Sequence, residues 1–170
     1  MSHEQELEER FDALYKAHKP MVLQLCLGYA KGDVELASDL CQEVLINTWN
    51  ALPGFRAEAS VKTWIYRITV NTCLLYLRKE SKSPIAPINM GTMEREVPIP
   101  EGESNASKAL YKAIGELPPL DRFIIMLVLE ELEYEEIERI VGISAVNLRV
   151  RIHRIRRKMK KSINQTNQNG

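Results

Sequence analysis

The chain has 170 residues, 45% hydrophobic and 27% charged, so it is long enough for one domain or two small ones and should fold and stay in solution. Its formal net charge is zero, but residues 1–80 carry 11 acidic and 9 basic side chains, whereas residues 106–170 carry 8 and 12. The basic C-terminal stretch suits a polyanion. The first 80 residues lack a general polyanion-binding field, and an acidic patch there could face a protein partner.

Targeting and metal-binding signals are absent from the sequence. The N-terminus has no apolar stretch of the kind that a signal peptide needs, and no run of about 18 apolar residues could span a bilayer. We therefore expect a cytoplasmic protein. The three histidines are scattered, which predicts no metal site and no cofactor. The cysteines are odd in number and far apart in apolar stretches, which indicates buried free thiols: Cys26, Cys41 and Cys73.

Residues 5–30 are expected to form the first helix, with an interruption near Pro20. Asp33 can cap the second helix. One face of that helix is an apolar stripe, made of Ala37, Leu40, Cys41, Val44, Leu45 and Thr48. Its opposite face is polar and should be exposed; it consists of Asp39, Gln42, Glu43 and Asn47.

Pro53 and Gly54 end this helix, a loop follows over 55–60, and Ser60 can cap a third helix that runs to about residue 82. Aromatic side chains alternate there with arginine and asparagine, a composition that suits single-stranded bases stacking on rings while cations hold the phosphates. The residues concerned are Trp64, Tyr66, Arg67, Asn71, Tyr76, Arg78 and Lys79. For Trp64 the alternative of simple core packing is the preferred interpretation.

Residues 81–105 contain four of the eight prolines, with Ser, Asn and Gly between them and no helical period. This composition predicts an extended linker. It divides the chain into a first domain over 1–80 and a second over 106–161, both helical, and we expect a disordered tail over 162–170. No strand pattern is present, so the predicted fold class is all-α.

The segment 134–161 has the layout of a helix-turn-helix, in which the second helix enters a DNA major groove. A short helix ends in a Gly-Ile-Ser turn, and Ser144 can cap the next helix. That helix has a buried face at spacings of four, three and four residues, formed by Leu148, Ile152, Ile155 and Met159. Val146, Val150, His153, Arg154 and Arg157 point away from it, with Arg149 and Lys160 on the flank. The alternative is a solvated basic face on an ordinary helical hairpin.

Taken together, successive motifs of the chain resemble those of bacterial extracytoplasmic-function (ECF) sigma factors. The resemblance covers about residues 8 to 161 and includes the order and spacing of DLCQEVLINTWNAL, FRAEASVKTWIYRITVN, YLRK, ELPPLDR and YEEIERIVGIS. It implies a sigma-two and a sigma-four domain joined by a linker. The implied function is that of a promoter-specificity subunit, which binds core RNA polymerase and directs transcription initiation and promoter melting.

The resemblance also implies a role for each surface. The surface expected to bind the clamp helices of the polymerase beta-prime subunit is Asp39, Gln42, Glu43 and Asn47. The surface expected to melt and hold the minus-ten element is Phe55, Arg56, Ser60, Lys62, Tyr66, Arg67, Asn71 and Arg78. The surface expected to read the minus-thirty-five duplex is Ser144, Asn147, Arg149, Val150, Arg151, His153, Arg154 and Arg157. Further expected partners are the beta flap of polymerase and an anti-sigma factor, often membrane-bound in this family.

Three positions depart from the usual family pattern. Leu75 stands where the family commonly has aspartate, and Glu133 replaces the usual Ser or Thr N-cap, a loss of about 1 kcal/mol. Val150 stands where a small polar residue is usual; it cannot hydrogen-bond a base edge but can touch a thymine methyl group.

Two other functions have to be weighed. A stand-alone regulator with a LuxR-type helix-turn-helix would use the first domain for sensing or dimerisation, but the polar helix face and the loop over 55–60 argue against it. An enzyme such as a small helical hydrolase would need a phosphate loop, a nucleophile with a base, or paired carboxylates. The sequence shows none of these, so we expect neither catalysis nor a small-molecule substrate.

Overall fold

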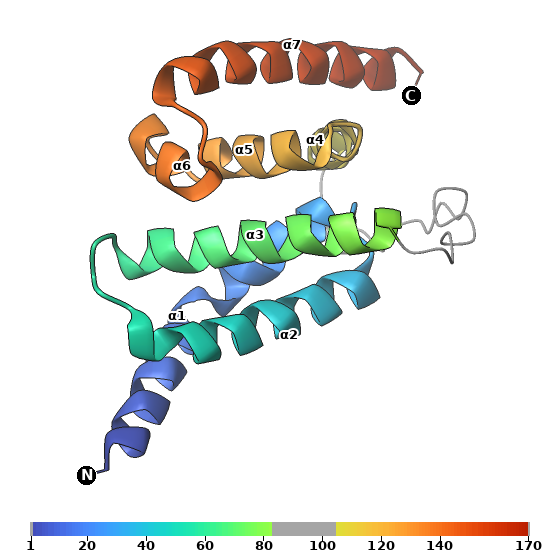
Figure 1. Cartoon of the computed structure of the whole chain (residues 1–170). Coiled ribbons are helices and arrows are strands. Elements are labelled where there is room, and N and C mark those ends of the chain that lie inside the picture. Colours follow the sequence, from blue (N-terminus) through green and yellow to red (C-terminus); the bar gives the residue numbers. More distant parts are fainter. Residues whose placement is uncertain (1, 83–104, 170) are drawn as a thin grey trace.

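The computed structural model describes residues 2–82 and 105–169, and within these ranges the chain is helical without strands (Figure 1). The first half contains α1 (His3–Tyr29), α2 (Val34–Ala51), the short 3-10 helix η1 (Leu52–Gly54) and α3 (Val61–Lys82). The second half contains α4 (Asn105–Gly115), α5 (Pro119–Leu129), α6 (Tyr134–Val141) and α7 (Ala145–Asn169). The predicted all-α class is confirmed, and most of the linker expected over 81–105 lies outside the described residues.

The helices begin where the sequence offers capping groups. The Asp33 carboxylate accepts a hydrogen bond from the Leu36 amide at 3.1 Å, and the Ser60 hydroxyl accepts one from the Thr63 amide at 3.1 Å. Both predicted caps are therefore confirmed. Such caps satisfy backbone donors that the first turn of a helix leaves without a partner.

Two expectations about helix limits are wrong. Helix α1 continues through Pro20 without interruption. The carbonyl that proline leaves without its usual partner is that of Lys16, and both residues are exposed, so water can solvate it.

The tail expected to be disordered is instead the last part of α7, which extends to Asn169. Its side chains contact the rest of the second half: the Ser162 hydroxyl donates to the Glu116 carboxylate at 2.7 Å, and Ile163 packs against the core. Packing against α4 therefore supplies the stability that the polar composition of the tail does not.

The apolar stripe of α2 faces inward as predicted: Ala37, Leu40, Cys41, Val44 and Thr48 are buried, and Leu45 is half-buried. This stripe packs against α1 and α3, whose inner residues include Val22, Leu25, Ile65 and Val70. The arrangement holds the polar face of α2 toward solvent.

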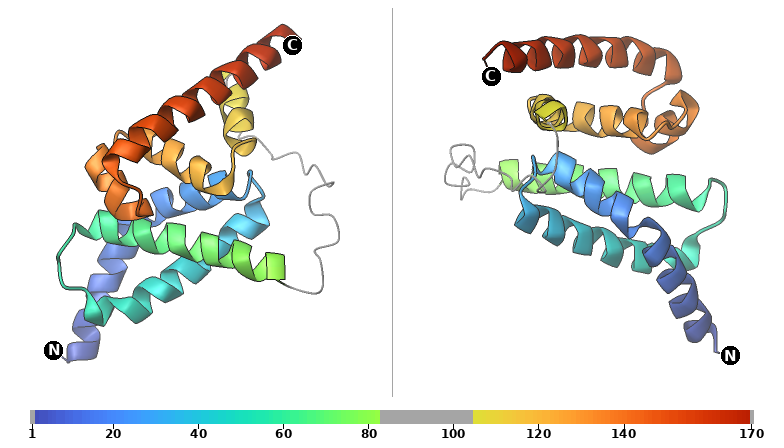
Figure 2. Two further views of the ribbon diagram at one scale, coloured as in Figure 1. Left: turned by 45° about the horizontal axis from the view of Figure 1, so that its top comes forward. Right: turned by 180° about the vertical axis from the view of Figure 1, so that it is seen from behind.

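The two halves pack directly on each other. Figure 1 shows α5 and α6 between α7 on one side and α3 on the other, and the further views agree (Figure 2). The hydrophobic core is continuous across the boundary, where the rings of Tyr29 and Phe123 stack with centroids 5.5 Å apart. One face of the first half is thus covered by the second half.

Candidate nucleic-acid and polymerase interfaces

The outer face of α2 is a polar surface backed by the buried stripe. The side chains of Asp39, Gln42, Glu43 and Asn47 are all exposed. The Asn47 amide also donates to the Thr72 hydroxyl of α3 at 3.0 Å, which fixes it against the neighbouring helix. Ile46 is exposed on this helix as well, and sequence reasoning missed it because an isolated isoleucine next to a buried stripe is normally assigned to the core.

The loop after η1 is held at the start of α3 by aromatic packing. The rings of Phe55 and Trp64 lie 4.8 Å apart, and both side chains are only partly buried. Trp64 packs against the core, which agrees with the preferred interpretation of that residue. Arg56 is exposed on the loop, and Lys62 is exposed on the first turn of α3. The loop and the first turn of α3 thus carry two exposed cations and a half-exposed pair of rings.

Tyr66 does not present its ring to solvent. Its side chain is 4% exposed, and burial, together with the nearby charge of Glu130, raises the pKa of Tyr66 to about 12. The expectation that this ring is available for base stacking is wrong for the arrangement described. The sequence could not show this, because Glu130 lies in the second half of the chain.

Arg67 contacts the second half of the chain. Its guanidinium donates through Nε to the Arg139 carbonyl at 2.7 Å, and through Nη2 to the same oxygen. That carbonyl belongs to the last turn of α6, where helices carry partial negative charge. Further along α3, Asn71, Leu75 and Arg78 are exposed.

Helices α6 and α7 form the expected helix-turn-helix. Gly142 ends α6 with φ of +77°, a conformation that favours glycine. Glu133 begins α6 without a side-chain cap, whereas the Ser144 hydroxyl accepts from the Asn147 amide at 3.3 Å. The Glu138 carboxylate also accepts from the Ala145 amide at 3.2 Å, so it ties α6 to the first turn of α7.

The buried and exposed faces of α7 agree with the spacing of its residues. Leu148, Ile152, Ile155 and Met159 are buried. The opposite surface is exposed and carries Val146, Asn147, Arg149, Val150, His153, Arg154 and Arg157. We call this set the α7 outer surface. It presents cations around two exposed valines.

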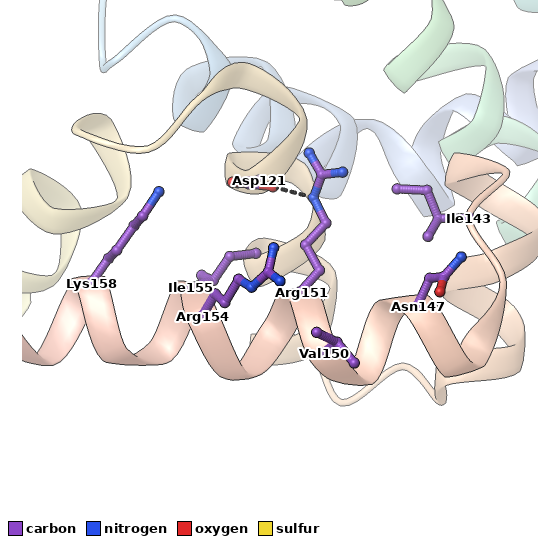
Figure 3. Close-up of a pocket in the computed structure, with 8 residues that line it drawn as sticks. All are labelled: Asp121, Ile143, Asn147, Val150, Arg151, Arg154, Ile155 and Lys158. Carbon is purple, nitrogen blue, oxygen red and sulfur yellow. Dashed lines mark hydrogen bonds and ion pairs between the residues drawn. The ribbon is translucent and has the colours of Figure 1, made fainter.

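Arg151 has a structural partner. Its Nε donates to the Asp121 carboxylate of α5 at 2.5 Å, and 39% of its side chain stays exposed (Figure 3). The two residues lie in a cleft of about 620 Å³ that is also lined by Arg154 and Lys158. Sequence reasoning missed Asp121 because it lies 30 positions from its partner. Arg151 therefore orients α7 on α5, and its role toward DNA stays a prediction.

The described residues contain no group of three or more metal-ligating side chains. The cysteines are buried free thiols, as predicted, and a hydrogen bond to Cys73 together with burial raises the pKa of Cys26. Among the described residues, no helix is long and apolar enough to cross a membrane.

Comparisons with known proteins bear on both halves. Residues 14–83 match the family Sigma-70 region 2, and residues 107–159 match Sigma-70, region 4. The ECF RNA polymerase sigma-E factor of Escherichia coli strain K12 is 31% identical over 163 residues, covering 88% of this chain and 84% of that protein. The RNA polymerase sigma factor YlaC of Bacillus subtilis strain 168 is 28% identical, covering 96% and 95%.

The chain belongs to the ECF RNA polymerase sigma factors. It is accordingly a promoter-specificity subunit of RNA polymerase, and the predicted fold and family are confirmed. The alternative of a LuxR-type regulator is not supported, because the first half also matches a sigma-factor family, in addition to the half that contains the helix-turn-helix.

Solved structures agree with this fold. The sigma factor RpoE in complex with the anti-sigma factor NepR from Bartonella quintana has a TM-score of 0.78 at 20% identity, covering 92% of this chain and 98% of that one. CnrH in complex with the cytosolic domain of CnrY has a TM-score of 0.65 at 16% identity, covering 93% and 90%.

Proposed function

We propose that this ECF sigma factor uses three surfaces. The outer face of α2 binds core polymerase, and α3 with its preceding loop binds the minus-ten element. The α7 outer surface binds the minus-thirty-five element. One observation carries the proposal. The chain presents two separate groups of cations, on α3 and on α7. The outer face of α2, opposite its buried stripe, is instead acidic and polar.

The outer face of α2 is suited to a protein partner. Asp39 and Glu43 are one turn apart and exposed, so they add negative charge without contributing to the core. We assign this face to the clamp helices of the beta-prime subunit, and the second half to the beta flap. Electrostatic complementarity at such a surface favours fast and specific association.

The loop over 55–60 and the exposed residues of α3 are suited to unpaired bases. Phe55 and Trp64 supply partly exposed rings, and Arg56 and Lys62, exposed on the same loop and first turn, supply cations that can bind phosphates. Asn71 supplies a polar side chain further along the same helix. Single-strand binding at this place would stabilise an opened promoter.

The α7 outer surface is suited to a duplex. Its first two turns follow the helix-turn-helix turn, and in this motif those turns contact base edges. Arg149 and Arg154 can bind guanine edges, while the cations further along α7 lie where phosphates would pass.

Regulation and location follow from the same assignment. We infer that an anti-sigma factor binds this chain, because a solved structure with this fold is described as a sigma factor in complex with an anti-sigma factor. We also infer that the protein acts in the cytoplasm, where polymerase works, and that it has no catalytic activity of its own.

Reconstitution with core polymerase tests the function. The purified chain should direct transcription from a specific promoter in a template library, and core enzyme alone should not. Specific DNA binding without any polymerase-dependent transcription would instead indicate a stand-alone regulator.

A further inference from the structure

We propose that Asp121 is a positioning residue for duplex binding. It holds the Arg151 guanidinium in the cleft between α5 and α7, where this cation and Lys158 form a site for a backbone phosphate. The inference rests on the proposed role of α7. It goes further because it gives a buried carboxylate of another helix a part in DNA binding, and because it assigns the cleft a ligand, the phosphodiester group.

Asp121 is a carboxylate in a mostly apolar helix. Its side chain is only 10% exposed, and the residues that follow it in α5 are buried. Burial removes the hydration of a carboxylate, so such a group needs a cation or several donors nearby. Arg151 of α7 supplies the cation, with its Nε 2.5 Å from the carboxylate. The adjacent Arg122 donates instead to the carbonyls of Tyr29 and Leu117.

The way in which Arg151 is paired suits a second acceptor. A guanidinium carries five N–H donors in a planar fork, and Asp121 accepts from the one on Nε. The donors on the two terminal nitrogens are those that make a bidentate contact with phosphate. Because 39% of the Arg151 side chain is exposed, a ligand can reach it. Asp121 thus fixes the plane of the fork through a nitrogen that is not at its end.

The cleft adjoins the surface that we assign to base edges. It has a volume of about 620 Å³, and Lys158 lines it two turns after Arg151. Figure 3 shows both side chains extending from α7 on the side of α5. Asn147, Val150 and Arg154 also line the cleft, and all three belong to the α7 outer surface. The cleft is therefore continuous with that surface.

A duplex that α7 reads brings a strand backbone to this flank of the helix. The major groove is about 12 Å wide, and a helix with its side chains is about 10–12 Å across, so a recognition helix fills the groove. The phosphates of each strand then pass along the two flanks of the helix, beside the face that contacts bases. The cleft lies on one of these flanks. A phosphate is accordingly the group that docking of the α7 outer surface would bring to Arg151 and Lys158.

This role predicts an effect opposite to that of simple electrostatics. Asp121 is negatively charged, so its removal should strengthen DNA binding if only its charge mattered. If Asp121 positions Arg151, its removal lets the guanidinium adopt other rotamers and weakens the phosphate contact. A role in packing alone would change thermal stability and leave the salt dependence of binding unchanged. The three explanations can therefore be separated.

Four variants and one control make the test. Asp121→Leu removes the charge and the acceptor, whereas Asp121→Asn removes the charge and keeps an oxygen that can accept from Nε–H. Arg151→Ala removes the guanidinium, and the double variant Asp121→Leu with Arg151→Ala shows whether Asp121 acts through Arg151. The control is Glu116→Gln, which neutralises another carboxylate that contacts α7, through Ser162.

Each full-length variant is combined with core polymerase, and its affinity is measured by fluorescence anisotropy over a salt series. The probe is a double-stranded promoter fragment that the wild type has selected from the template library. The contacts of polymerase itself are the same in every sample, so differences between variants belong to this chain. Thermal unfolding of each free chain shows that it is folded at the temperature of the assay.

Arg151→Ala should lower the slope of log affinity against log salt by about 0.9, the value of one phosphate contact, which makes binding on the order of eightfold weaker at 0.1 M salt. Asp121→Leu should weaken binding about threefold or more and lower the slope in the same direction. Asp121→Asn should lie between Asp121→Leu and the wild type. Glu116→Gln should bind at least as tightly as the wild type, and Asp121→Leu should cause no further loss when Arg151 is already alanine.

Unchanged or tighter binding by Asp121→Leu would overturn the proposal, as would an equal loss with and without the Arg151 guanidinium, or a loss without change in the salt slope. If Asp121→Leu does not fold, Asp121→Asn in the same cycle carries the test with the same sign. The proposed function is judged separately. A wild type that selects no promoter with core polymerase refutes that function, whereas normal promoter selection with undiminished binding by Asp121→Leu refutes only the positioning role.

Discussion

Val150 places an apolar side chain on the face of α7 that we assign to base edges. It is 52% exposed, and Val146, one turn earlier, is 71% exposed. Exposure of this kind has no folding benefit, and the thymine methyl is the apolar group that the major groove offers. A valine is also stiff, so it can be held in one rotamer against such a methyl group at little entropic cost.

We predict that replacing the contacted thymine with deoxyuridine weakens wild-type binding by about 0.8 kcal/mol, roughly fourfold, which is the value of one buried methyl group. Val150→Ala should bind both duplexes equally. Val34→Ala, an exposed valine on α2, is the control and should retain the discrimination. Fluorescence anisotropy of holoenzyme on the two duplexes measures the effect, and equal discrimination by Val150→Ala would show that this side chain does not touch the methyl group.

Arginines and lysines along α7 should differ in what they contribute. Arg149→Ala or Arg154→Ala should cost about 1–3 kcal/mol and relax base preference, if a bidentate contact to a base is lost. Lys160→Ala or Lys161→Ala should mainly flatten the dependence of affinity on salt concentration, because a phosphate contact releases counterions. Footprinting across a salt series separates the two cases, and identical behaviour of all four variants would contradict the assignment.

At the scale of the helix, α2 illustrates what a local pattern can predict. Its cap at Asp33, its buried stripe and its exposed polar face all follow from neighbours within a few residues. Other contacts join residues that are far apart in the sequence. Arg67 lies 72 residues from Arg139, and Arg151 lies 30 residues from Asp121, so no periodicity could reveal either pair. The extension of α7 was missed for the same reason, since its support comes from Glu116.

The polar face of α2 should be separable from the stability of the helix. Asp39→Arg with Glu43→Arg should abolish association with core polymerase and promoter-directed transcription. Exposed substitutions usually change the free energy of unfolding by less than about 0.5 kcal/mol, so the melting temperature should stay near wild type. The matched control is Glu8→Arg with Asp12→Arg, an exposed acidic pair of the same spacing on α1. A double variant of α2 that folds and still directs transcription would refute this docking face.

The last turns of α7 should contribute to stability. Deleting residues 162–170 removes the contact of Ile163 with the core and the hydrogen bond between Ser162 and Glu116. We expect a loss of about 1–2 kcal/mol, from partial burial of one isoleucine and one hydrogen bond. Thermal unfolding followed by circular dichroism measures this, and Ile163→Ala should reproduce most of the loss. An unchanged melting temperature would mean that the segment does not pack.

At the scale of the whole molecule, the proposed function assigns promoter opening to α3 and promoter recognition to α7, so it uses both halves. Asn71→Ala should leave polymerase binding and duplex recognition intact but slow strand opening, since Asn71 lies on α3 and not on α2 or α7. Permanganate reactivity of unpaired thymines reports opening directly. Asn167→Ala makes the same chemical change on an exposed part of α7 and should open promoters normally; equal rates for both variants would exclude Asn71 from the opening step.

The three cysteines give this chain a built-in chemical reporter. All of them lie in α1, α2 and α3, all are buried, and the second half contains none. Alkylating reagents attack thiolates, and both burial and the raised pKa of Cys26 keep this group a protonated thiol at neutral pH. Labelling should therefore be slow while the first half is folded. The rate of alkylation would then report the unfolding of the first half, with no added label or introduced residue.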